Sequence, residues 1–165
     1  MLSVGHATRS FHRSCSRSRV RAPKRSSITS VHAYADGASR GNPGRSGCGA
    51  LLVDPLTGRV LATDTKYVGD NKTNNEAEYH GLVLALQLAH RYQAIHVHVH
   101  MDSQLIVRQM QDRYRVRATN LWKLHQQCKK LSAALPFVTF IHVDRDNNVA
   151  ADRLANEAIQ DSGPS

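Results

Sequence analysis

The first half of the chain alternates short apolar runs with turn-forming residues, a pattern typical of antiparallel strands. Residues 31–35, 48–53 and 59–68 each have the composition and length of a strand. The segment from Asp54 to Gly58 is a strong turn signal, and the polar residues 70–75 predict a loop. We therefore predict three strands that form an antiparallel meander.

The second half of the chain alternates helical and strand patterns. Apolar residues recur at helical spacing in four segments, whereas two others alternate as strands do. The first two predicted helices cover 76–92 and 103–112. A third is capped by Thr119 or Asn120 and closed by Pro136, and a fourth runs from Asn147 or Asn148 to Gln160. The two predicted strands cover 95–101 and 137–143. The predicted fold class is α/β: a five-stranded mixed sheet in the order β-β-β-α-β-α-α-β-α, flanked by helices.

The strand predicted at 95–101 carries three histidines on one face, His96, His98 and His100. Their shared face raises the question of a zinc site. The first and the last of them are about 13 Å apart at the rise of a strand, too far to meet one ion. We therefore expect packing against a helix or partial exposure, and no zinc site.

Charge is distributed unevenly along the 165 residues. The net charge is +9, but residues 1–31 hold seven of the 22 Lys and Arg and no acidic residue. The basic, Ser- and Arg-rich leader 1–30 has the composition of an organelle transit peptide, which does not distinguish mitochondrion from plastid. The alternative is a disordered basic arm that binds nucleic acid without sequence preference. No apolar run approaches the roughly 18 residues of a membrane span.

The three cysteines, Cys15, Cys48 and Cys128, are scattered and form no paired motif. Their odd number and spacing argue against a disulfide framework or a zinc site. We expect Cys48 and Cys128 to be small core residues.

The most informative segment is 36–44, Asp-Gly-Ala-Ser-Arg-Gly-Asn-Pro-Gly. It follows a predicted strand, so we expect Asp36 at the end of that strand, immediately before a turn. The glycines allow close approach of another backbone. A carboxylate on a rigid strand beside such a turn suits metal and phosphate chemistry, although an ordinary hairpin turn has the same composition.

Three further acids fall at the ends of predicted elements: Glu78, Asp102 and Asp152. Singly, each has a structural interpretation as a helix cap or as a partner of the helix dipole. Brought together with Asp36, they would repel one another unless cations neutralised them, and an oxygen-only ligand set selects Mg²⁺ or Mn²⁺. Two such ions roughly 3.5–4 Å apart activate water and stabilise the leaving oxygen of a phosphodiester.

Four segments, in order, resemble the signatures of type 1 ribonuclease H. They are Asp36 to Gly44, Thr73-Asn-Asn-Glu-Ala-Glu78, Asp102-Ser-Gln104 and Asn148-Val-Ala-Ala-Asp152, and the resemblance extends over residues 31–160. It implies an endonuclease that cleaves the RNA strand of RNA–DNA hybrids and leaves 3′-hydroxyl and 5′-phosphate ends.

The resemblance also implies a role for each matched residue. Asp36, Glu78, Asp102 and Asp152 would hold two Mg²⁺ ions, with Mn²⁺ as a possible substitute. Asp36 would bridge the ions, and Glu78 would also meet the ribose 2′-hydroxyl or the attacking water. The matched substrate contacts are Ser39, Asn42, Asn75 and Gln104 in the minor groove and Thr73 at a DNA-strand phosphate.

The chain departs from many bacterial members of this family in two places. Where they carry a basic, Trp-rich protrusion, residues 113–119 form only a short Arg-rich segment. Where they carry a mobile His, this chain has a compact loop with Arg145, as in the compact archaeal and plant-like subgroup. We expect Arg145 to help product release or to stabilise phosphate charge, and His142 to be a weaker candidate that faces the core.

These features together predict one catalytic domain over residues 31–162, acting as a monomer in an organelle without membrane insertion. Two alternatives remain. A hybrid-binding module without catalysis is disfavoured by the intact set of four carboxylates, and a domain derived from a retroelement is disfavoured by the composition of the leader.

Overall fold

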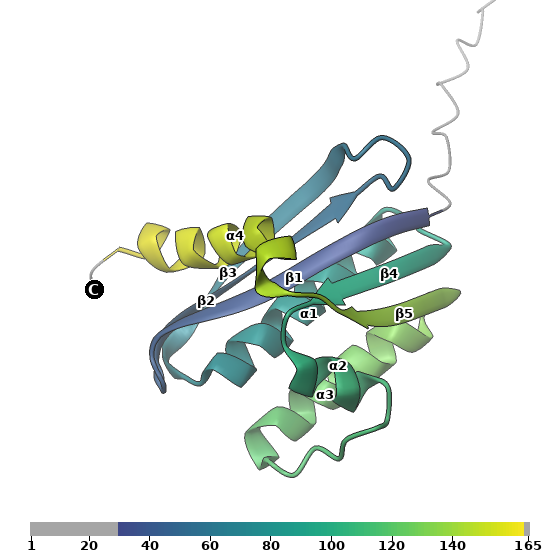
Figure 1. Ribbon diagram of the computed structural model, residues 1–165. Helices are drawn as coiled ribbons and strands as arrows, with labels where there is room; N and C mark the ends of the chain where they lie inside the picture. The colour runs from purple at the N-terminus through teal and green to yellow at the C-terminus, as the bar shows by residue number, and fades with distance from the viewer. Residues whose placement is uncertain (1–29, 164–165) are drawn as a thin grey trace, which may run out of the picture.

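The computed structural model describes residues 30–163, which form a single five-stranded sheet with helices on both faces (Figure 1). The elements are β1 (Ser30–Gly41), β2 (Gly44–Val53), β3 (Val60–Lys72), α1 (Asn74–Arg91), β4 (His96–Met101), α2 (Gln104–Met110), α3 (Thr119–Ala133), β5 (Phe137–His142), the 3-10 helix η1 (Arg145–Asn147) and α4 (Val149–Asp161). The predicted element order is confirmed. Except for Ser30, the predicted leader lies outside the described residues, so the transit peptide stays a prediction.

The sheet has the strand order β3-β2-β1-β4-β5. β1, β2 and β3 pair antiparallel, whereas β4 pairs parallel with both β1 and β5. This confirms the predicted mixed sheet. α1, α2 and α3 lie on one face, and α4 crosses β1, β2 and β3 on the other (Figure 1). None of the helices in residues 30–163 is long and apolar enough to span a membrane.

The main core lies between the sheet and the layer that contains α1 and α3. Alternate residues of β1 and β4 point into it and are almost fully buried, as are the apolar positions of α1. Cys48 and Cys128 are free thiols buried in this core, as expected from the sequence.

Three strands are longer than the sequence predicts. β1 runs on to Gly41 and β2 begins at Gly44, so the predicted turn shrinks to Asn42 and Pro43, and Asp36 lies inside a strand. Backbone ladder bonds do not depend on side-chain hydrophobicity, so a polar hairpin can extend beyond the apolar run. For the same reason β3 continues to Lys72 and takes up part of the loop predicted at 70–75.

α1 and α3 begin at residues other than those predicted. α1 starts at Asn74, two residues before the predicted start at residue 76. Thr73 caps α1 in a reciprocal capping box: its hydroxyl accepts from the Glu76 amide, and the Glu76 carboxylate accepts from the Thr73 amide. The N-cap of α3 is Ala118, whereas the sequence predicts Thr119 or Asn120. Ala118 has no side-chain oxygen and therefore gives no capping signal.

α1 packs directly on the backbone of β1 at two glycines. A Cβ at Gly37 would lie 2.1 Å from the carbonyl carbon of Ala77, and one at Gly81 would lie 2.4 Å from the carbonyl oxygen of Asp36. Real Cβ atoms do not approach backbone so closely, so these positions accept only glycine. The contact places the first turns of α1, including Glu78, beside Asp36.

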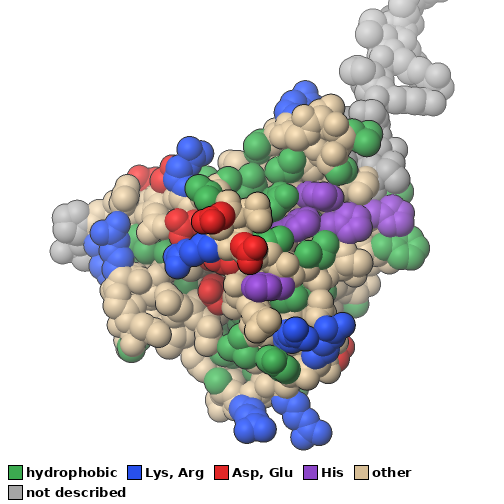
Figure 2. Space-filling model, viewed as in Figure 1, with side chains coloured by type: hydrophobic (Ala, Val, Ile, Leu, Met, Phe, Trp, Pro, Cys, Tyr) green, Lys and Arg blue, Asp and Glu red, His purple; other side chains and the backbone are tan. Residues whose placement is uncertain are grey.

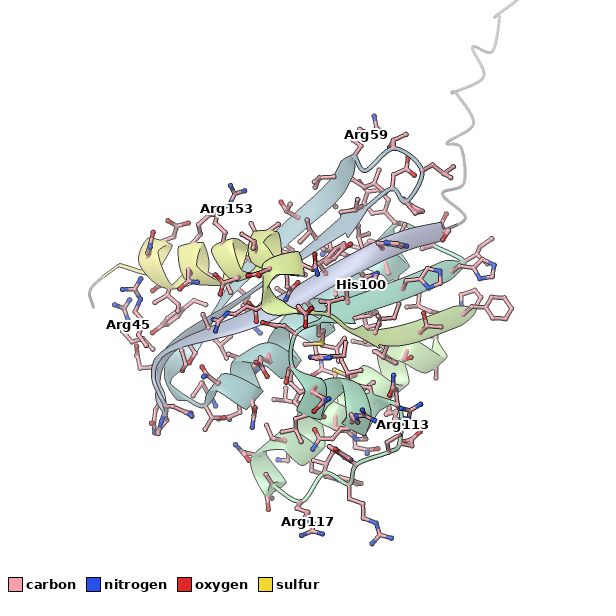
Figure 3. All side chains as sticks on the ribbon, viewed as in Figure 1. Arg45, Arg59, His100, Arg113, Arg117 and Arg153 are labelled. Atoms are coloured by element: carbon pink, nitrogen blue, oxygen red, sulfur yellow. The ribbon has the colours of Figure 1, made fainter. Side chains whose placement is uncertain are left out.

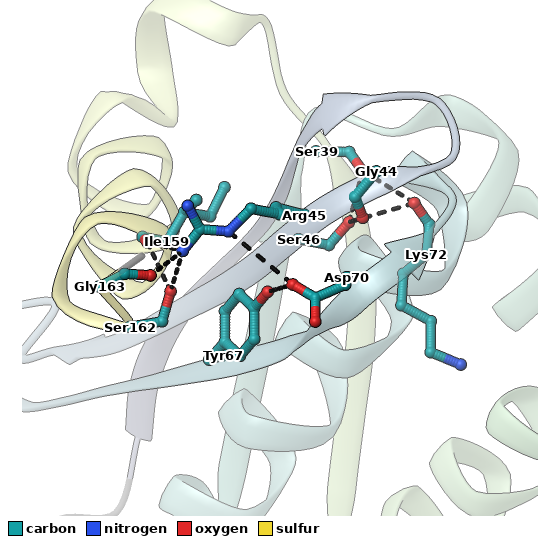
Figure 4. Close-up of polar contacts among 10 residues, drawn as sticks. All are labelled: Ser39, Gly44, Arg45, Ser46, Tyr67, Asp70, Lys72, Ile159, Ser162 and Gly163. Atoms are coloured by element: carbon teal, nitrogen blue, oxygen red, sulfur yellow. Dashed lines mark hydrogen bonds and ion pairs between the residues drawn. The ribbon is translucent and has the colours of Figure 1, made fainter. Parts of the chain in front are cut away.

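α4 approaches β2 in a similar way. Gly49 pairs with Asp36 across the β1–β2 ladder, and a Cβ there would lie 2.4 Å from the Cβ of Leu154. The far end of α4 is held by Arg45 of β2, whose guanidinium donates to Ser162 Oγ at 2.7 Å and to the Gly163 carbonyl at 2.6 Å (Figure 4). Both ends of α4 are thereby fixed relative to the sheet.

Replacing Gly81 by Ala tests the backbone contact between α1 and β1. Alanine normally stabilises a helix interior by up to about 1 kcal/mol relative to glycine. Here we expect the opposite sign, a loss of about 1–3 kcal/mol in the free energy of unfolding, because the new methyl group meets immobile backbone. Urea unfolding followed by circular dichroism measures the change.

Gln87→Ala, a partly exposed position in the same helix, is the matched control and should change the free energy of unfolding by less than about 0.5 kcal/mol. A Gly81→Ala protein as stable as the wild type would contradict the contact.

Candidate active site

Four carboxylates from four different elements line one open cavity of about 520 Å³. The cavity lies where the middle of β1 and the carboxyl end of β4 meet the first turns of α1 and α4, and Figure 2 shows the acidic side chains gathered there. Its acidic lining comprises Asp36, Glu78, Asp102, Asp144 and Asp152. The four acids expected from the sequence are thus brought together, and Asp144 joins them.

Asp36 and Asp102 come from neighbouring parallel strands. Asp36 is only 4% exposed, and one of its oxygens accepts from the Gly37 amide at 2.8 Å. The amide of Asn148, itself 1% exposed, donates both to the Ala35 carbonyl at 3.0 Å and to Asp102 Oδ1 at 3.2 Å. Asn148 therefore joins the N-terminus of α4 to both strands and orients Asp102.

Glu78 and Asp152 project from the first turns of α1 and α4. The hydroxyl of Ser103 lies near the Glu78 carboxyl and lowers its pKa, opposing the effect of burial. Arg145 lies 3.6 Å from Asp152, with its own side chain 80% exposed. The neighbouring acid Glu76 has a different task, because its carboxylate accepts from Thr73 in the capping box of α1.

Burial and mutual repulsion keep two of these carboxyls from ionising easily. Desolvation, followed by the charges of Asp102, Glu78 and Asp152, raises the pKa of Asp36 to about 8, against the effect of the Gly37 amide. Desolvation also raises the pKa of Glu78 to about 7, with Asp102 adding to the shift and Ser103 and Arg145 opposing it. Positive charge in the cavity would therefore be strongly favoured, because it would offset the repulsion between the carboxylates.

The donor set fits a hard divalent cation. All four acids offer oxygen ligands, which Mg²⁺ and Mn²⁺ prefer, and a cation would offset the repulsion that raises the pKa of Asp36. Within residues 30–163, no three His, Cys, Asp or Glu side chains already meet around one point at ligand distance. Metal binding at this site therefore requires the carboxylates to turn toward a shared ion.

The predicted substrate contacts are split between the cavity and its surroundings. Ser39 lines the cavity and donates to the Lys72 carbonyl at 2.9 Å. Asn42 accepts from the Asn74 amide at 3.3 Å, which joins the β1–β2 turn to the start of α1. Thr73 is engaged in the α1 cap, and Asn75 and Gln104 lie at the first turns of α1 and α2; these three do not line the cavity.

Sequence reasoning missed several residues of the cavity. His142 lines it and is exposed, so the expectation that it faces the core is wrong. Asn74, Asp144 and Asn156 also line it. The position of His142 at the last residue of β5, the third parallel strand, was an available signal, because parallel strands present their carboxyl ends at one edge.

The three histidines of β4 are partly exposed, which is one of the two outcomes expected from the sequence; the other was packing against a helix. His98 and His100 are half-buried and His96 is exposed, on the sheet face that also carries α4 (Figure 3 labels His100). No zinc cluster is formed by the residues that the structure describes. Ile95, the first residue of the strand predicted at 95–101, precedes β4 and is 37% exposed.

The Arg-rich connection between α2 and α3 lies apart from the carboxylates. Arg113 and Arg117 extend from it into solvent (Figure 3). Arg108 lies over the ring of Tyr114 at 5.8 Å. This segment is a short basic surface and not an extended protrusion.

The comparisons with known proteins agree with this architecture. Residues 34–158 match the family model described as reverse transcriptase-like. Ribonuclease HI of Halobacterium salinarum is 36% identical over 132 residues, covering 80% of this chain and 65% of its own. The chain belongs to the ribonuclease H family.

Solved ribonuclease H structures share the fold over most of this chain. The N-terminal ribonuclease H domain of a bifunctional Mycobacterium tuberculosis protein has a TM-score of 0.77 at 40% identity, covering 81% of this chain and 96% of that domain structure. The Halobacterium salinarum enzyme has a TM-score of 0.76 at 36% identity, covering 80% and 98%. LC11 ribonuclease H1, solved with an RNA/DNA hybrid, has a TM-score of 0.74 at 37% identity, covering 80% and 98%.

The match to the full-length mycobacterial protein is partial. At 42% identity over 125 residues, the aligned part is 76% of this chain but only 34% of that relative. The chain thus spans about a third of the mycobacterial protein.

The raised pKa of Asp36 predicts how stability depends on pH. Its folded pKa of about 8 lies above its ordinary value of 3.8, so the folded protein holds a proton that the unfolded chain releases. The stability from this group is present below about pH 4 and is lost as pH rises through about 8. Asp36→Asn removes this loss, so in EDTA it should stabilise the protein at about pH 9 by at least about 1 kcal/mol relative to the wild type.

The difference between Asp36→Asn and wild type should shrink toward pH 4, as measured by urea unfolding across this range. Asp161→Asn, an exposed acid at the other end of α4, is the control and should show no such growth with pH. An effect of Asp36→Asn on the free energy of unfolding that does not change with pH would contradict the raised pKa of the Asp36 carboxyl.

Proposed function

We propose that this protein hydrolyses the RNA strand of RNA–DNA hybrids. The observation that carries the proposal is the convergence of Asp36, Glu78, Asp102 and Asp152 from four elements on one open cavity. Membership of the ribonuclease H family, and the likeness to a ribonuclease H1 solved with an RNA/DNA hybrid, support this choice of substrate.

The four carboxylates would hold two Mg²⁺ ions, or Mn²⁺ in their place. Bound ions of this kind supply an activated water and stabilise the leaving oxygen of a phosphodiester. Attack of that water on phosphorus, with cleavage of the P–O3′ bond and protonation of the leaving 3′ oxygen, would give 3′-hydroxyl and 5′-phosphate ends. Asp36, buried between Asp102 and the α1 backbone, is best placed to serve both ions. Asn148 keeps Asp102 directed toward the cavity.

Glu78 is suited to recognise the RNA strand. As an ionised metal ligand, its carboxylate would still have a lone pair that can accept a hydrogen bond from a neighbouring hydroxyl. The 2′-hydroxyl is the group that distinguishes RNA from DNA at such a site. We assign Glu78 to contact this hydroxyl or the attacking water.

The start of α1 offers a place for the nucleic-acid backbone. Asn74, its first residue, lines the cavity next to Ser39. The positive end of the helix dipole favours a phosphate at this position. The bond from the Asn74 amide to Asn42 ties the β1–β2 turn to this end of the helix, so both would meet the hybrid as one rigid surface.

Cleavage of an end-labelled RNA–DNA hybrid tests the function directly. With Mg²⁺ we expect the wild type to cut only the RNA strand, and we expect EDTA or Asp102→Asn to abolish cutting. Asp144→Asn is the matched control, because Asp144 lines the same cavity but is not among the four assigned ligands; it should keep most of the activity.

Two results of this assay would oppose the proposal. Tight binding of the hybrid without cutting by the wild type would indicate a binding module. Equal losses in Asp144→Asn and Asp102→Asn would show that the four ligands are wrongly assigned.

Arg145 is proposed to stabilise phosphate charge at the cavity rim. Its guanidinium is exposed and only loosely paired with Asp152, which leaves it available to a phosphate. Arg145→Ala should lower the single-turnover cleavage rate by about tenfold to hundredfold, and Arg145→Lys should lower it less. Arg153→Ala, on the outer side of α4 (Figure 3), is the control and should cleave normally. An unchanged single-turnover rate with slower steady-state turnover would instead assign Arg145 to product release.

A further inference from the structure

One half of the sheet face that carries α4 is left open in the described part of the chain. α4 packs on β1, β2 and β3, whereas the same face of β4 and β5 presents its side chains outward. Phe137 is 60% exposed and Ile141 36% exposed. Figure 2 shows a row of histidines on this face, running away from the acidic side chains.

The rings on this face are arranged in pairs. His96 stacks on Phe137 with centroids 4.8 Å apart and an interplanar angle of 9°. Tyr34 stacks on His100 at 4.7 Å and 16°. His32 lies between His98 and His100, with centroids 5.4 and 4.7 Å away. We call these six residues the aromatic face: His32, Tyr34, His96, His98, His100 and Phe137.

The aromatic face is continuous with the carboxylate cavity. β1 and β4 run parallel with His32 beside His98 and Tyr34 beside His100, and two residues further along each strand come Asp36 and Asp102. At the rise of a strand, His96 lies about 20 Å from Asp102 along β4. A nucleic-acid strand that leaves the cavity in this direction would therefore pass over the rings.

The chemistry of the aromatic face favours bases over phosphates. Burial lowers the pKa of His32, the ring between His98 and His100, and His98 adds to the shift. The lowered pKa favours the uncharged form of this ring, and Tyr34 and Phe137 beside the histidines carry no charge. Flat, uncharged rings on an open sheet are the platform on which unpaired bases stack, with little dependence on sequence.

We propose that the aromatic face binds a single-stranded extension of the nucleic acid whose hybrid part occupies the carboxylate cavity. The preferred substrates would then be hybrids flanked by a single strand, with Phe137 and His96 as the outer stacking platform. This inference rests on the proposed ribonuclease H function for what occupies the cavity, but the stacking surface can be tested separately.

Binding of a fluorescently labelled single-stranded DNA oligonucleotide by the full chain in EDTA is the first test, read by anisotropy. Phe137→Leu keeps an apolar side chain but removes the ring, and should weaken binding by about tenfold. Phe137→Tyr keeps the ring and should bind as the wild type does. All three proteins keep the same basic residues 1–29, so the contribution of that segment is common to them.

The salt dependence of binding separates stacking from charge neutralisation. Stacking releases few counterions, so Phe137→Leu should weaken binding by a similar factor at low and at moderate salt. Equal affinities of the wild type and Phe137→Leu would overturn the proposal. So would a wild-type dimer that Phe137→Leu converts to a monomer in sedimentation, because the aromatic face would then be an interface between two copies.

Cleavage assays distinguish failure of this inference from failure of the proposed function. The wild type should cut a hybrid with a single-stranded tail at lower KM than a blunt hybrid, and Phe137→Leu should remove that advantage while cutting the blunt hybrid normally. If the blunt hybrid is not cut at all, the proposed function fails, whatever the oligonucleotide binds. If both hybrids are cut equally well by both proteins, only the aromatic face is refuted.

Discussion

The close contact between the α1 backbone and the β1 backbone is the constraint on which the site depends. Helices normally lie 8–10 Å from their neighbours because side chains separate them. Gly37 and Gly81 remove that spacing at one crossing, so the backbones of Asp36 and of Ala77 and Glu78 come together. A carboxylate from a strand and one from a helix then share a cavity without either leaving its regular element. Gly49 has the corresponding role under α4, which carries Asp152.

This packing brings like charges together, so electrostatic repulsion opposes it. Four carboxylates repel one another, and Asp36 is held where water cannot screen it, which is why its pKa rises to about 8. The fold opposes this repulsion with contacts that fix the elements carrying the acids: the capping box of α1, the Asn148 bridge between α4 and two strands, and the hydrogen bonds of Arg45 to the end of α4. A cation would relieve the same repulsion, so stability without metal and affinity for metal are opposed properties of one site.

Much of the fold could be predicted from sequence because hydrophobic periodicity marks buried faces. The alternation at 95–101 and the apolar stripe of α1 located their elements well. The hairpin formed by β1 and β2 was predicted too short because ladder hydrogen bonds leave no mark on side-chain pattern, so Asp36 was placed at the end of a strand that continues for five more residues. Among site residues, the four acids were found by their places at the ends of elements and by motif resemblance. Asp144 was not found, and His142 was only a weaker candidate expected to face the core, because their places in the cavity follow from which strands are neighbours, and the strand order β2-β1-β4-β5 cannot be derived from local pattern.

The distribution of charge leaves the domain with little general attraction for nucleic acid. Outside residues 1–31 the chain has 15 basic and 13 acidic residues, and five of the acids line the cavity itself. A net charge so close to zero supplies little of the counterion-release affinity that dominates most nucleic-acid binding. Affinity must then come from local contacts: the positive end of the α1 dipole, the exposed guanidinium of Arg145, the short Arg-rich connection after α2, and apolar or stacking surface. The open face of β4 and β5 carries stacked rings that are continuous with the cavity, and the proposed stacking of bases on it would add attraction that does not depend on charge. We therefore expect such a domain to select nucleic acids by their shape and by whether they are single- or double-stranded, more than by the long-range electrostatic field of the protein.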